Sequence, residues 1–384
     1  MTKSLPEPLN PLPGQHVDTI DTPALVIDLD AMERNLQRMA EFAKHHHVSL
    51  RPHAKMHKSA ALARLQMQAG AVGVCVQKTA EAERLAAAGV PNIYISNEVI
   101  APAKLQRVAA LAQTLAGLGG QLAIAVDSLE GIRRLASAMG GRSALIDVFV
   151  EIDVGQGRCG VPPGAAAVVL AQEIRRHSAL HLAGLQAYHG KAQHFRTVQQ
   201  RREAIAQAVT DVARTRQLIE AAGMTVELVT GAGTGTFALE ATSGVYGELQ
   251  AGSFMFMDAD YAQNESDPAQ PQFEHALFVK TQVVSTAADH AVCDAGHKSH
   301  AIDSGLPRVQ GRDLDYLNGG DEHGILRAAR PGVRLPALGD TLWLIPGHCD
   351  PTVNLHDFLI GVRGGLQRGT VEQIIRVDAR GALS

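Results

Sequence analysis

Short apolar runs alternate with longer amphipathic stretches over the first two thirds of the chain. The short runs are rich in Val, Ile, Leu and Ala, which is typical of strands buried on both faces, and the stretches between them repeat apolar residues at helical spacing. The predicted strands are 48–51, 72–76, 92–96, 122–126, 146–152, 182–188, 225–229 and 248–251. The predicted helices include 59–69, 79–88, 103–115, 129–138, 165–177 and 198–222.

Alternation of strands and helices predicts parallel βαβ units, and eight such units close a β/α barrel. We therefore expect an α/β fold with an N-terminal (β/α)8 TIM-type barrel over residues 31–262. After residue 262 the helical pattern largely stops, and strand-like runs separated by Gly, Pro and Asp turns predict a C-terminal β-rich domain over residues 263–384. The strand-like run Ala24–Asp30 would be a ninth strand, one more than the barrel needs. We therefore expect residues 1–30 to complete the β-rich domain.

Composition narrows the class of protein. The 384 residues are 46% hydrophobic and 19% charged, as in soluble globular proteins, and the formal net charge of -4 argues against a nucleic-acid or anionic-membrane partner. No apolar run approaches the roughly 20 residues that span a bilayer, and the N-terminus lacks the apolar core of a signal peptide. Four widely spaced cysteines suit reduced thiols, so we expect a cytoplasmic protein.

One short segment concentrates potential cations. The sequence Arg51-Pro-His-Ala-Lys55-Met-His-Lys58 places five of them within eight residues. An amine crowded by positive charge and partly desolvated loses its proton easily, which makes a lysine nucleophilic near neutral pH. Lys55 is therefore a candidate Schiff-base lysine. The alternative is a solvated basic loop.

Other polar and glycine-rich positions follow successive predicted strands, where β/α barrels carry their active sites. These are Gln77, Arg158, Tyr188, the Gly233-Thr234 turn and the Gly252-Ser253 turn. The two turns follow the seventh and eighth strands, where barrels often hold a phosphate on backbone N–H groups. An imine-forming lysine, a phosphate site and an arginine together suggest pyridoxal phosphate. The glycine spacing does not favour a dinucleotide.

A second cluster, Gly347-His348-Cys349-Asp350-Pro351, has the composition of a metal site. If it continues the predicted strand 341–345, period two puts His348 and Asp350 on one face. Such a hard, open site favours Mn²⁺, Mg²⁺ or Co²⁺. The alternative is that His348 caps a turn while Cys349 fills the core.

Two further segments carry candidate functional side chains. His194 is a candidate general base, because the pKa of an imidazole suits proton transfer near neutral pH, although a loop histidine is often structural. The polar run Asp321-Glu-His-Gly324 is either a turn or a contribution to a neighbouring active site.

Ordered motifs along most of the chain resemble one enzyme family. They are Arg51-Pro-His-Ala-Lys55-x-His57-Lys58, Gly157-Arg158-Cys-Gly-Val161, Leu185-Gln-Ala-Tyr188-His-Gly190, Glu248-Leu-Gln-Ala-Gly252-Ser253, Asp321-Glu-His-Gly324 and His348-Cys-Asp350-Pro. From about residue 20 to the C-terminus the chain resembles the D-threonine aldolases and the related 3-hydroxy-D-aspartate aldolases. That family belongs with the fold-type III pyridoxal enzymes, alongside alanine racemase and D-serine dehydratase.

The resemblance implies roles for the candidate residues. Lys55 would carry pyridoxal 5'-phosphate, and His348 and Asp350 would bind a divalent metal, Mn²⁺ first among the candidates. The residues implied to hold the cofactor are Gln77, Arg158, Tyr188, Gly233, Thr234, Gly252 and Ser253. The segment Ala24–Asp30 would join the C-terminal domain of a homodimeric protein, in which Asp321 would face the partner's active site.

The expected reaction is retro-aldol cleavage of a D-β-hydroxy-α-amino acid to glycine and an aldehyde, with His194 accepting the β-hydroxyl proton. D-threonine and D-3-hydroxyaspartate are the candidate substrates, and the run Asp303–Pro307 looks closer to the hydroxyaspartate branch. A D-amino-acid dehydratase is the nearest alternative, but the dehydratases of this type carry a His-x-Cys pair. A racemase is disfavoured because racemization gives a metal ion no obvious role. A non-catalytic pyridoxal-phosphate carrier is disfavoured because such proteins resemble the barrel alone, without a C-terminal β-rich domain.

Overall fold

The computed structural model of the chain describes residues 13–384, which divide into two compact units. The larger unit comprises residues 36–254, 261–272 and 378–384. Its strands are β2 (Ser49–Leu50), β3 (Val74–Val76), β4 (Asn92–Ile95), β5 (Gln121–Val126), β6 (Ile146–Glu151), β7 (Leu180–Ala187), β8 (Leu228–Gly231) and β9 (Glu248–Leu249). All pair in parallel, in the order β2-β9-β8-β7-β6-β5-β4-β3.

The two ends of this order are joined, so the sheet closes into a barrel. The amide of Val72 donates to the Leu50 carbonyl and that of Cys75 to the Pro52 carbonyl, and His53 and Cys75 form a parallel bridge. The barrel interior holds the cluster Cys75, Tyr94, Ala123, Ala125, Phe149 and Ala183. Small alanines leave room for the rings of Tyr94 and Phe149, whose centroids are 4.9 Å apart. The predicted fold class is therefore confirmed.

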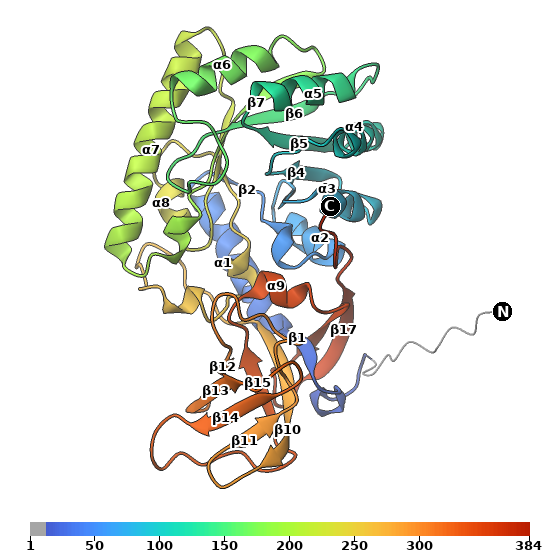
Figure 1. Ribbon diagram of the computed structural model, residues 1–384, viewed down its shortest axis with the longest axis vertical. Helices are drawn as coiled ribbons and strands as arrows, with labels where there is room; N and C mark the ends of the chain where they lie inside the picture. Colours follow the sequence, from blue (N-terminus) through green and yellow to red (C-terminus); the bar gives the residue numbers. More distant parts are fainter. Residues whose placement is uncertain (1–12) are drawn as a thin grey trace, which may run out of the picture. The chain divides into compact units, whose positions relative to one another are not determined.

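Helices cover the outside of the barrel strands (Figure 1). They are α2 (Ala60–Gln68), α3 (Thr79–Ala87), α4 (Pro102–Gly117), α5 (Leu129–Met139), α6 (Ala165–Ile174), α7 (Val198–Ala221) and the short α8 (Phe237–Ala241), with α1 (Leu29–His45) preceding the first barrel strand. Local sequence sets several helix starts. The Ser128 side chain accepts from the amide of Gly131, and Thr197 and Gln200 form a capping box at α7.

The smaller unit contains residues 255–260 and 273–377 together with the described residues up to 35. Its strands are β1 (Ala24–Asp28), β10 (Leu277–Thr286), β11 (Ala291–Cys293), β12 (Arg308–Val309), β13 (Leu314–Asn318), β14 (Gly324–Ala328), β15 (Thr341–Ile345), β16 (Phe358–Arg363) and β17 (Thr370–Arg376). They form one mostly antiparallel sheet, in which β1 pairs antiparallel with β10 and parallel with β16. The part of the expected N-terminal contribution that falls on residues 1–12 lies outside the described residues.

Two features of the strands differ from the sequence prediction. The seventh barrel strand is β8, so Thr230 and Gly231 belong to it rather than to the following turn. A Cβ at Gly231 would lie 2.3 Å from the Ala187 carbonyl oxygen, so this strand requires a glycine where the sequence suggests a strand end. The strands β12, β13 and β14 differ from the prediction, because they are short and contain few β-branched residues.

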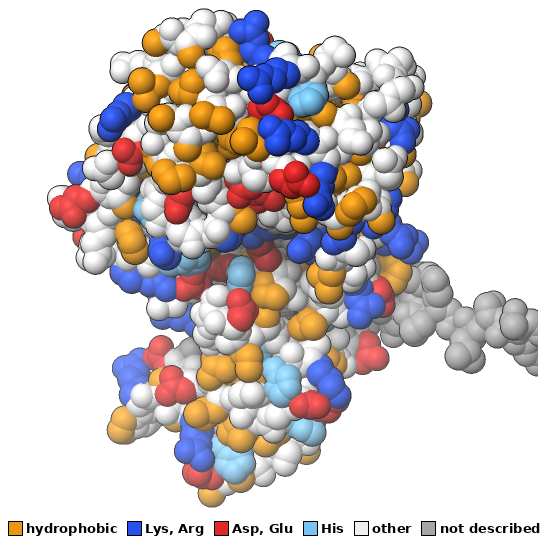
Figure 2. Space-filling model, turned by 45° about the horizontal axis from the view of Figure 1, so that its top comes forward, with side chains coloured by type: hydrophobic (Ala, Val, Ile, Leu, Met, Phe, Trp, Pro, Cys, Tyr) orange, Lys and Arg blue, Asp and Glu red, His pale blue; other side chains and the backbone are white. Residues whose placement is uncertain are grey.

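On the visible face of the barrel unit, acidic and basic side chains are interspersed among hydrophobic ones (Figure 2). Within residues 13–384, no helix combines the length and apolar character that crossing a lipid bilayer requires.

Candidate active site

Lys55 lies just beyond the carboxyl end of β2, on the 3-10 helix η2 (Ala54–Met56), and is half-buried. Local geometry ties it to the next two strands of the barrel. The His53 side chain accepts from the Lys55 amide through Nδ1 at 3.4 Å, and its Nε2 lies 2.9 Å from Gln77 Nε2 and 3.2 Å from Ser96 Oγ. Lys55 and Gln77 are therefore both held by one imidazole at the carboxyl ends of β2 and β3.

Two of the cations near Lys55 form ion pairs with acidic side chains. The expected crowding of unpaired positive charge around Lys55 is therefore wrong. Arg51 Nε lies 3.0 Å from Glu248 Oε2, and Lys58 Nζ lies 2.9 Å from Glu81 Oε1. The buried ring of His57 contacts Gln66 Oε1 at 3.2 Å. Buried acids on β9 and α3 compensate these two cations, so mutual repulsion does not explain a reactive amine at Lys55.

Two buried turns after β8 and β9 present backbone amides without acceptors. Within residues 13–384, the N–H groups of Gly233, Thr234, Gly252 and Ser253 donate no hydrogen bond to another protein group, although all four residues are buried. The turns are linked, because the amide of Phe254 donates to Thr234 Oγ1 at 3.0 Å. Unpartnered buried N–H groups are rare in proteins, so this arrangement has the form of an anion site.

The glycines of these turns also have a packing role. A Cβ at Gly233 would lie 2.5 Å from Gln193 Oε1, and one at Gly252 would lie 2.7 Å from the His53 carbonyl oxygen. Gln193 fixes the first turn, since its Oε1 accepts from the Gly235 amide at 2.9 Å. The close approach of neighbouring groups thus requires these glycines, and it is the four amides that give the two turns the form of an anion site.

Arg158 and Tyr188 lie next to each other. The guanidinium carbon of Arg158 is 5.9 Å from the centroid of the Tyr188 ring, which is a cation–π distance. Arg158 Nη2 is also 4.0 Å from Oε1 of Glu151, the last residue of β6. Burial, and then the charge of nearby Glu98, raises the pKa of Glu151 to about 9.

His194 lies on η3 (Lys191–His194), after β7, and is exposed. Its ring lies 5.5 Å from the ring of Tyr261. The neighbouring Gln193 is buried, and its Oε1 accepts from the Gly235 amide. In this loop Gln193 therefore stabilises the fold, whereas the side chain of His194 is exposed.

The second cluster has a different local structure from the one predicted. The strand β15 ends at Ile345, and Cys349–Val353 forms the short helix α9 with His348 as its N-cap residue. The expected strand extension to residue 350 is therefore wrong. Cys349 is buried, with Sγ 3.3 Å from the Met257 carbonyl oxygen, because the chain turns at His348.

His348 and Asp350 nevertheless converge. His348 Nε2 lies 3.9 Å from Asp350 Oδ1, and His348 Nδ1 lies 2.7 Å from Asp303 Oδ2. A carboxylate at Nδ1 favours the tautomer that leaves Nε2 as the electron-pair donor, as in metal sites where a carboxylate orients a ligating histidine. Sequence reasoning missed this role of Asp303, because 45 residues separate it from His348.

Asp321 and His356 both contact residues from other parts of the same unit. Asp321 lies in the turn between β13 and β14, where its Oδ1 is 2.9 Å from His297 Nε2 and its Oδ2 is 3.3 Å from Lys298 Nζ. His356 Nε2 lies 2.8 Å from the carbonyl oxygen of Ser299.

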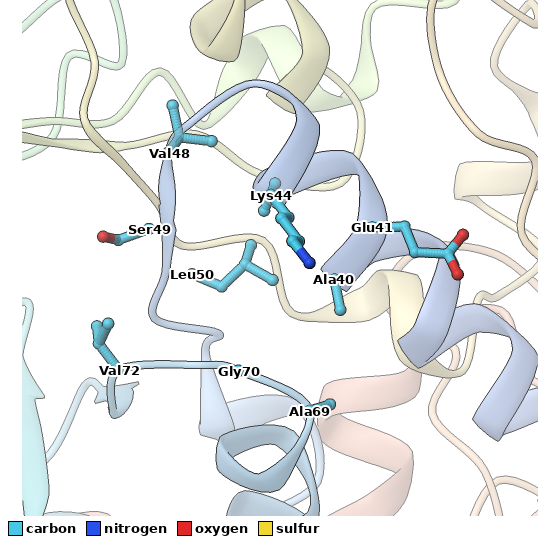
Figure 3. A pocket seen from close by; sticks show the side chains of 10 residues that line it. Ala40, Glu41, Lys44, Val48, Ser49, Leu50, Ala69, Gly70 and Val72 are labelled. Atoms are coloured by element: carbon cyan, nitrogen blue, oxygen red, sulfur yellow. The ribbon is translucent and has the colours of Figure 1, made fainter.

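A separate cavity of about 410 Å³ is lined by residues of α1 and by both residues of β2 (Figure 3). Its lining includes Lys44 on α1, Ser49 at the start of β2 and Val72 ahead of β3. The lining combines aliphatic side chains with Glu41, Lys44 and Ser49, and it contains none of the residues considered above for the cofactor or the metal.

The chain matches two family models, the alanine racemase N-terminal domain over residues 27–260 and the putative serine dehydratase domain over residues 276–362. It is 45% identical over 380 residues to a D-threonine aldolase of Arthrobacter sp., covering 98% of this chain and 97% of that protein. A 3-hydroxy-D-aspartate aldolase of Paracoccus denitrificans is 42% identical, covering 96% and 95%. A D-threo-3-hydroxyaspartate dehydratase of Delftia sp. is 30% identical, covering 87% and 92%.

The solved structures agree with these relatives. The crystal structure of a D-threonine aldolase from Filomicrobium marinum superposes with a TM-score of 0.93 at 47% sequence identity, covering 97% of this chain and 99% of that one. Such similarity over both units shows common ancestry. The chain therefore belongs to the D-threonine aldolase family, whose members are carbon–carbon lyases with an alanine racemase-like fold.

Proposed function

We propose that this chain is a metal-activated, pyridoxal-phosphate-dependent aldolase that cleaves a D-β-hydroxy-α-amino acid to glycine and an aldehyde. D-threonine and D-3-hydroxyaspartate are the substrates to test, since two aldolases that are 45% and 42% identical to the chain are named for them. The observation that carries the cofactor assignment is the pair of buried turns with unpartnered amides.

The residues present fit pyridoxal phosphate. The amides of Gly233, Thr234, Gly252 and Ser253 would hold its phosphate, and Lys55 would carry it covalently. Gln77, Arg158 and Tyr188 would hold the rest of the group; Gln77 shares a histidine with Lys55, and Arg158 stacks on Tyr188. When bound, the pyridoxal ring supplies an electron sink for bond cleavage at Cα.

His348 and Asp350 would hold a divalent cation, with Mn²⁺ as our first choice and Mg²⁺ or Co²⁺ as alternatives. An imidazole with Nε2 facing a carboxylate suits such an ion, and Asp303 fixes the orientation of the ring. The chemistry supplied there is a lowered pKa for a coordinated hydroxyl group.

A retro-aldol cleavage requires one base to accept the β-hydroxyl proton and one proton to reach Cα after the Cα–Cβ bond breaks. We assign the first role to His194. Its exposed position on η3 suits exchange of that proton with solvent between turnovers.

The dehydratase alternative has less support. Two solved variants of the D-threo-3-hydroxyaspartate dehydratase each replace one residue, a histidine in the first and a cysteine two positions later in the second. The structure of the cysteine variant is of the metal-free form. This chain has the same spacing with Asp350 in the second position. A carboxylate favours harder ions than a thiolate does, so the two pairs differ in metal chemistry.

Product analysis tests the proposal. The purified protein, supplied with cofactor and Mn²⁺, is incubated separately with D-threonine and with both D-3-hydroxyaspartate diastereomers. We expect glycine and an aldehyde in equal amounts. Ammonia and a 2-oxo acid would instead identify a dehydratase, and recovery of the L-enantiomer would identify a racemase.

The proposal retains two expectations that rest on the sequence and the resemblance, a homodimer and a cytoplasmic location. The four isolated cysteines support a reducing compartment. Light scattering of the cofactor-loaded protein measures the oligomeric state directly.

A further inference from the structure

Acidic side chains and a thiol meet at the carboxyl ends of β4, β5 and β6. Asp127 directly follows β5, Glu98 lies three residues after β4, and Cys159 lies on the loop after β6. One ligand atom from each of these three side chains lies within 4.8 Å of the others. None of the three has a role in the proposed reaction.

The loop that carries Cys159 is folded back in a fixed way. The amide of Asp153 donates to the Val161 carbonyl at 2.9 Å, and that of Val161 donates to the Glu151 carbonyl at 3.0 Å. Gly160 has a φ of +98°, and a Cβ there would lie 2.7 Å from the Asp153 amide nitrogen. The Gly160 amide donates to Asp127 Oδ2 at 3.2 Å. Backbone geometry therefore holds Cys159 over the ends of β4 and β5.

A second observation, the lack of hydrogen-bond partners for buried acidic oxygens beside the cluster, favours a bound cation. Glu151 is only 4% exposed, and within residues 13–384 its Oε2 has no hydrogen-bond partner. Glu151 lies beside the cluster, since its carbonyl accepts from Val161 on the loop that carries Cys159, and burial together with the charges of Glu98 and Asp127 raises its pKa. Both carboxylate oxygens of Glu98 are likewise buried with no hydrogen-bond partner in the described chain. Buried acids without donors bind either a proton or a cation, and the raised pKa of Glu151 means that a bound cation would take the place of its proton.

We propose that Glu98, Asp127 and Cys159 bind a divalent transition-metal ion, a second metal site distinct from His348 and Asp350, with Glu151 beside it. Ligands held at about 2.0–2.3 Å from one Zn²⁺ lie at most about 4.6 Å apart, so small side-chain movements close the observed group around an ion. The combination of two carboxylates and a thiolate suits Zn²⁺ or Co²⁺ better than Mg²⁺. Three protein ligands leave one position for water or Glu151.

The test counts bound metal rather than activity. Cofactor-loaded protein is stripped with chelator, dialysed against Zn²⁺ and analysed by elemental mass spectrometry. The variants are His348→Ala with Asp350→Ala, Glu98→Gln with Asp127→Asn, and the four substitutions together. Glu130→Gln is the matched control, since that exposed side chain lies three residues beyond Asp127. Removing like charges from the cluster should not impair folding, and the melting temperature checks this.

We expect two zinc ions per wild-type chain and one in the His348/Asp350 variant. In that background, Glu98→Gln with Asp127→Asn should weaken the remaining Zn²⁺ at least tenfold, whereas Glu130→Gln should leave it unchanged. Loss of all zinc from the His348/Asp350 variant overturns the proposal, as does a remaining zinc that is insensitive to Glu98 and Asp127. A single zinc lost only with Glu98 and Asp127 would support this site and refute the His348 assignment.

Cobalt gives an independent readout of the thiolate. Co²⁺ added to the His348/Asp350 variant should produce a thiolate-to-cobalt charge-transfer band in the near ultraviolet, measured as a difference spectrum against the cofactor-loaded protein. Cys159→Ser should abolish the band. A band that persists in Cys159→Ser excludes Cys159 as a ligand.

Discussion

Glu240→Gln should make the barrel unit more stable at alkaline pH but not at acidic pH. Glu240 is 1% exposed on α8; its Oε1 accepts from Thr236 Oγ1 at 2.8 Å, and within residues 13–384 its Oε2 has no partner. Burial raises the pKa of this carboxyl from the ordinary 4.5 to about 7. The folded protein thus favours the protonated acid, which glutamine resembles.

The sign follows from proton binding. Between pH 4.5 and about 7, the native state holds a proton on Glu240 that the unfolded state has released, so stability falls as the pH rises and levels off above about 7. At roughly 1.4 kcal/mol for each pKa unit, this amounts to about 3 kcal/mol of lost stability at pH 8. Glu240→Gln should therefore gain about 3 kcal/mol over the wild type at pH 8 and less than about 1 kcal/mol at pH 5.

The assay is urea denaturation followed by circular dichroism at pH 5 and pH 8. All other groups titrate in both proteins, so the difference between variant and wild type isolates Glu240. Glu220→Gln, on the exposed face of α7, is the control that should change stability equally at both pH values. An equal effect of Glu240→Gln at both pH values would refute the reasoning, because it would mean that the carboxyl titrates normally.

Four further substitutions test the site. Lys55→Ala should abolish turnover and the visible absorbance of the lysine-bound cofactor, and retained colour with activity would refute the assignment of Lys55. Asp303→Ala should raise the metal concentration for half-maximal activity by about 10- to 100-fold, since the Nδ1 partner of His348 is lost, and an unchanged value would exclude this role. Thr234→Val should weaken cofactor binding about fivefold in reconstitution titrations, since a buried hydrogen bond of about 1 kcal/mol to the Phe254 amide is lost, and unaltered affinity would contradict it. Gly252→Ala should reduce cofactor binding further, because the new methyl group would meet the His53 carbonyl, and full affinity would show that the turn tolerates a Cβ.

The sequence predicted the barrel well because its signal is periodic. Parallel strands that are buried on both faces appear as short apolar runs, and the amphipathic helices between them appear as apolar residues at helical spacing. Both patterns can be recognised in a single sequence. The strands β13 and β14 lack this signal, since they form a short antiparallel hairpin with few β-branched residues, and β14 pairs in addition with β11.

The candidate site was predictable only as far as residue type and position along the strands allow. Neighbouring cations make Lys55 a candidate from the sequence, yet Glu248 and Glu81 pair with two of these cations across sequence separations that no local pattern reveals. The proximity of Asp303 to His348, and of Asp127 to Glu98, could not be predicted from the sequence either. Side-chain contacts between segments that are far apart in the sequence can be identified only once the fold is known.

The pairing of β1 bears on how the chain is made. Ala24 pairs with Lys280 and Val26 with Ile360, so the first strand to be synthesised finds both of its neighbours more than 250 residues later. The residues Leu25, Val26 and Ile27 are fully buried in the finished sheet, and they remain without these partners while the barrel emerges. A nascent chain therefore carries an unpaired apolar strand until β10 and β16 have been made, and such segments bind chaperones or aggregate when chaperones are scarce. Truncation before β16 should accordingly lower solubility more than the loss of surface area alone suggests.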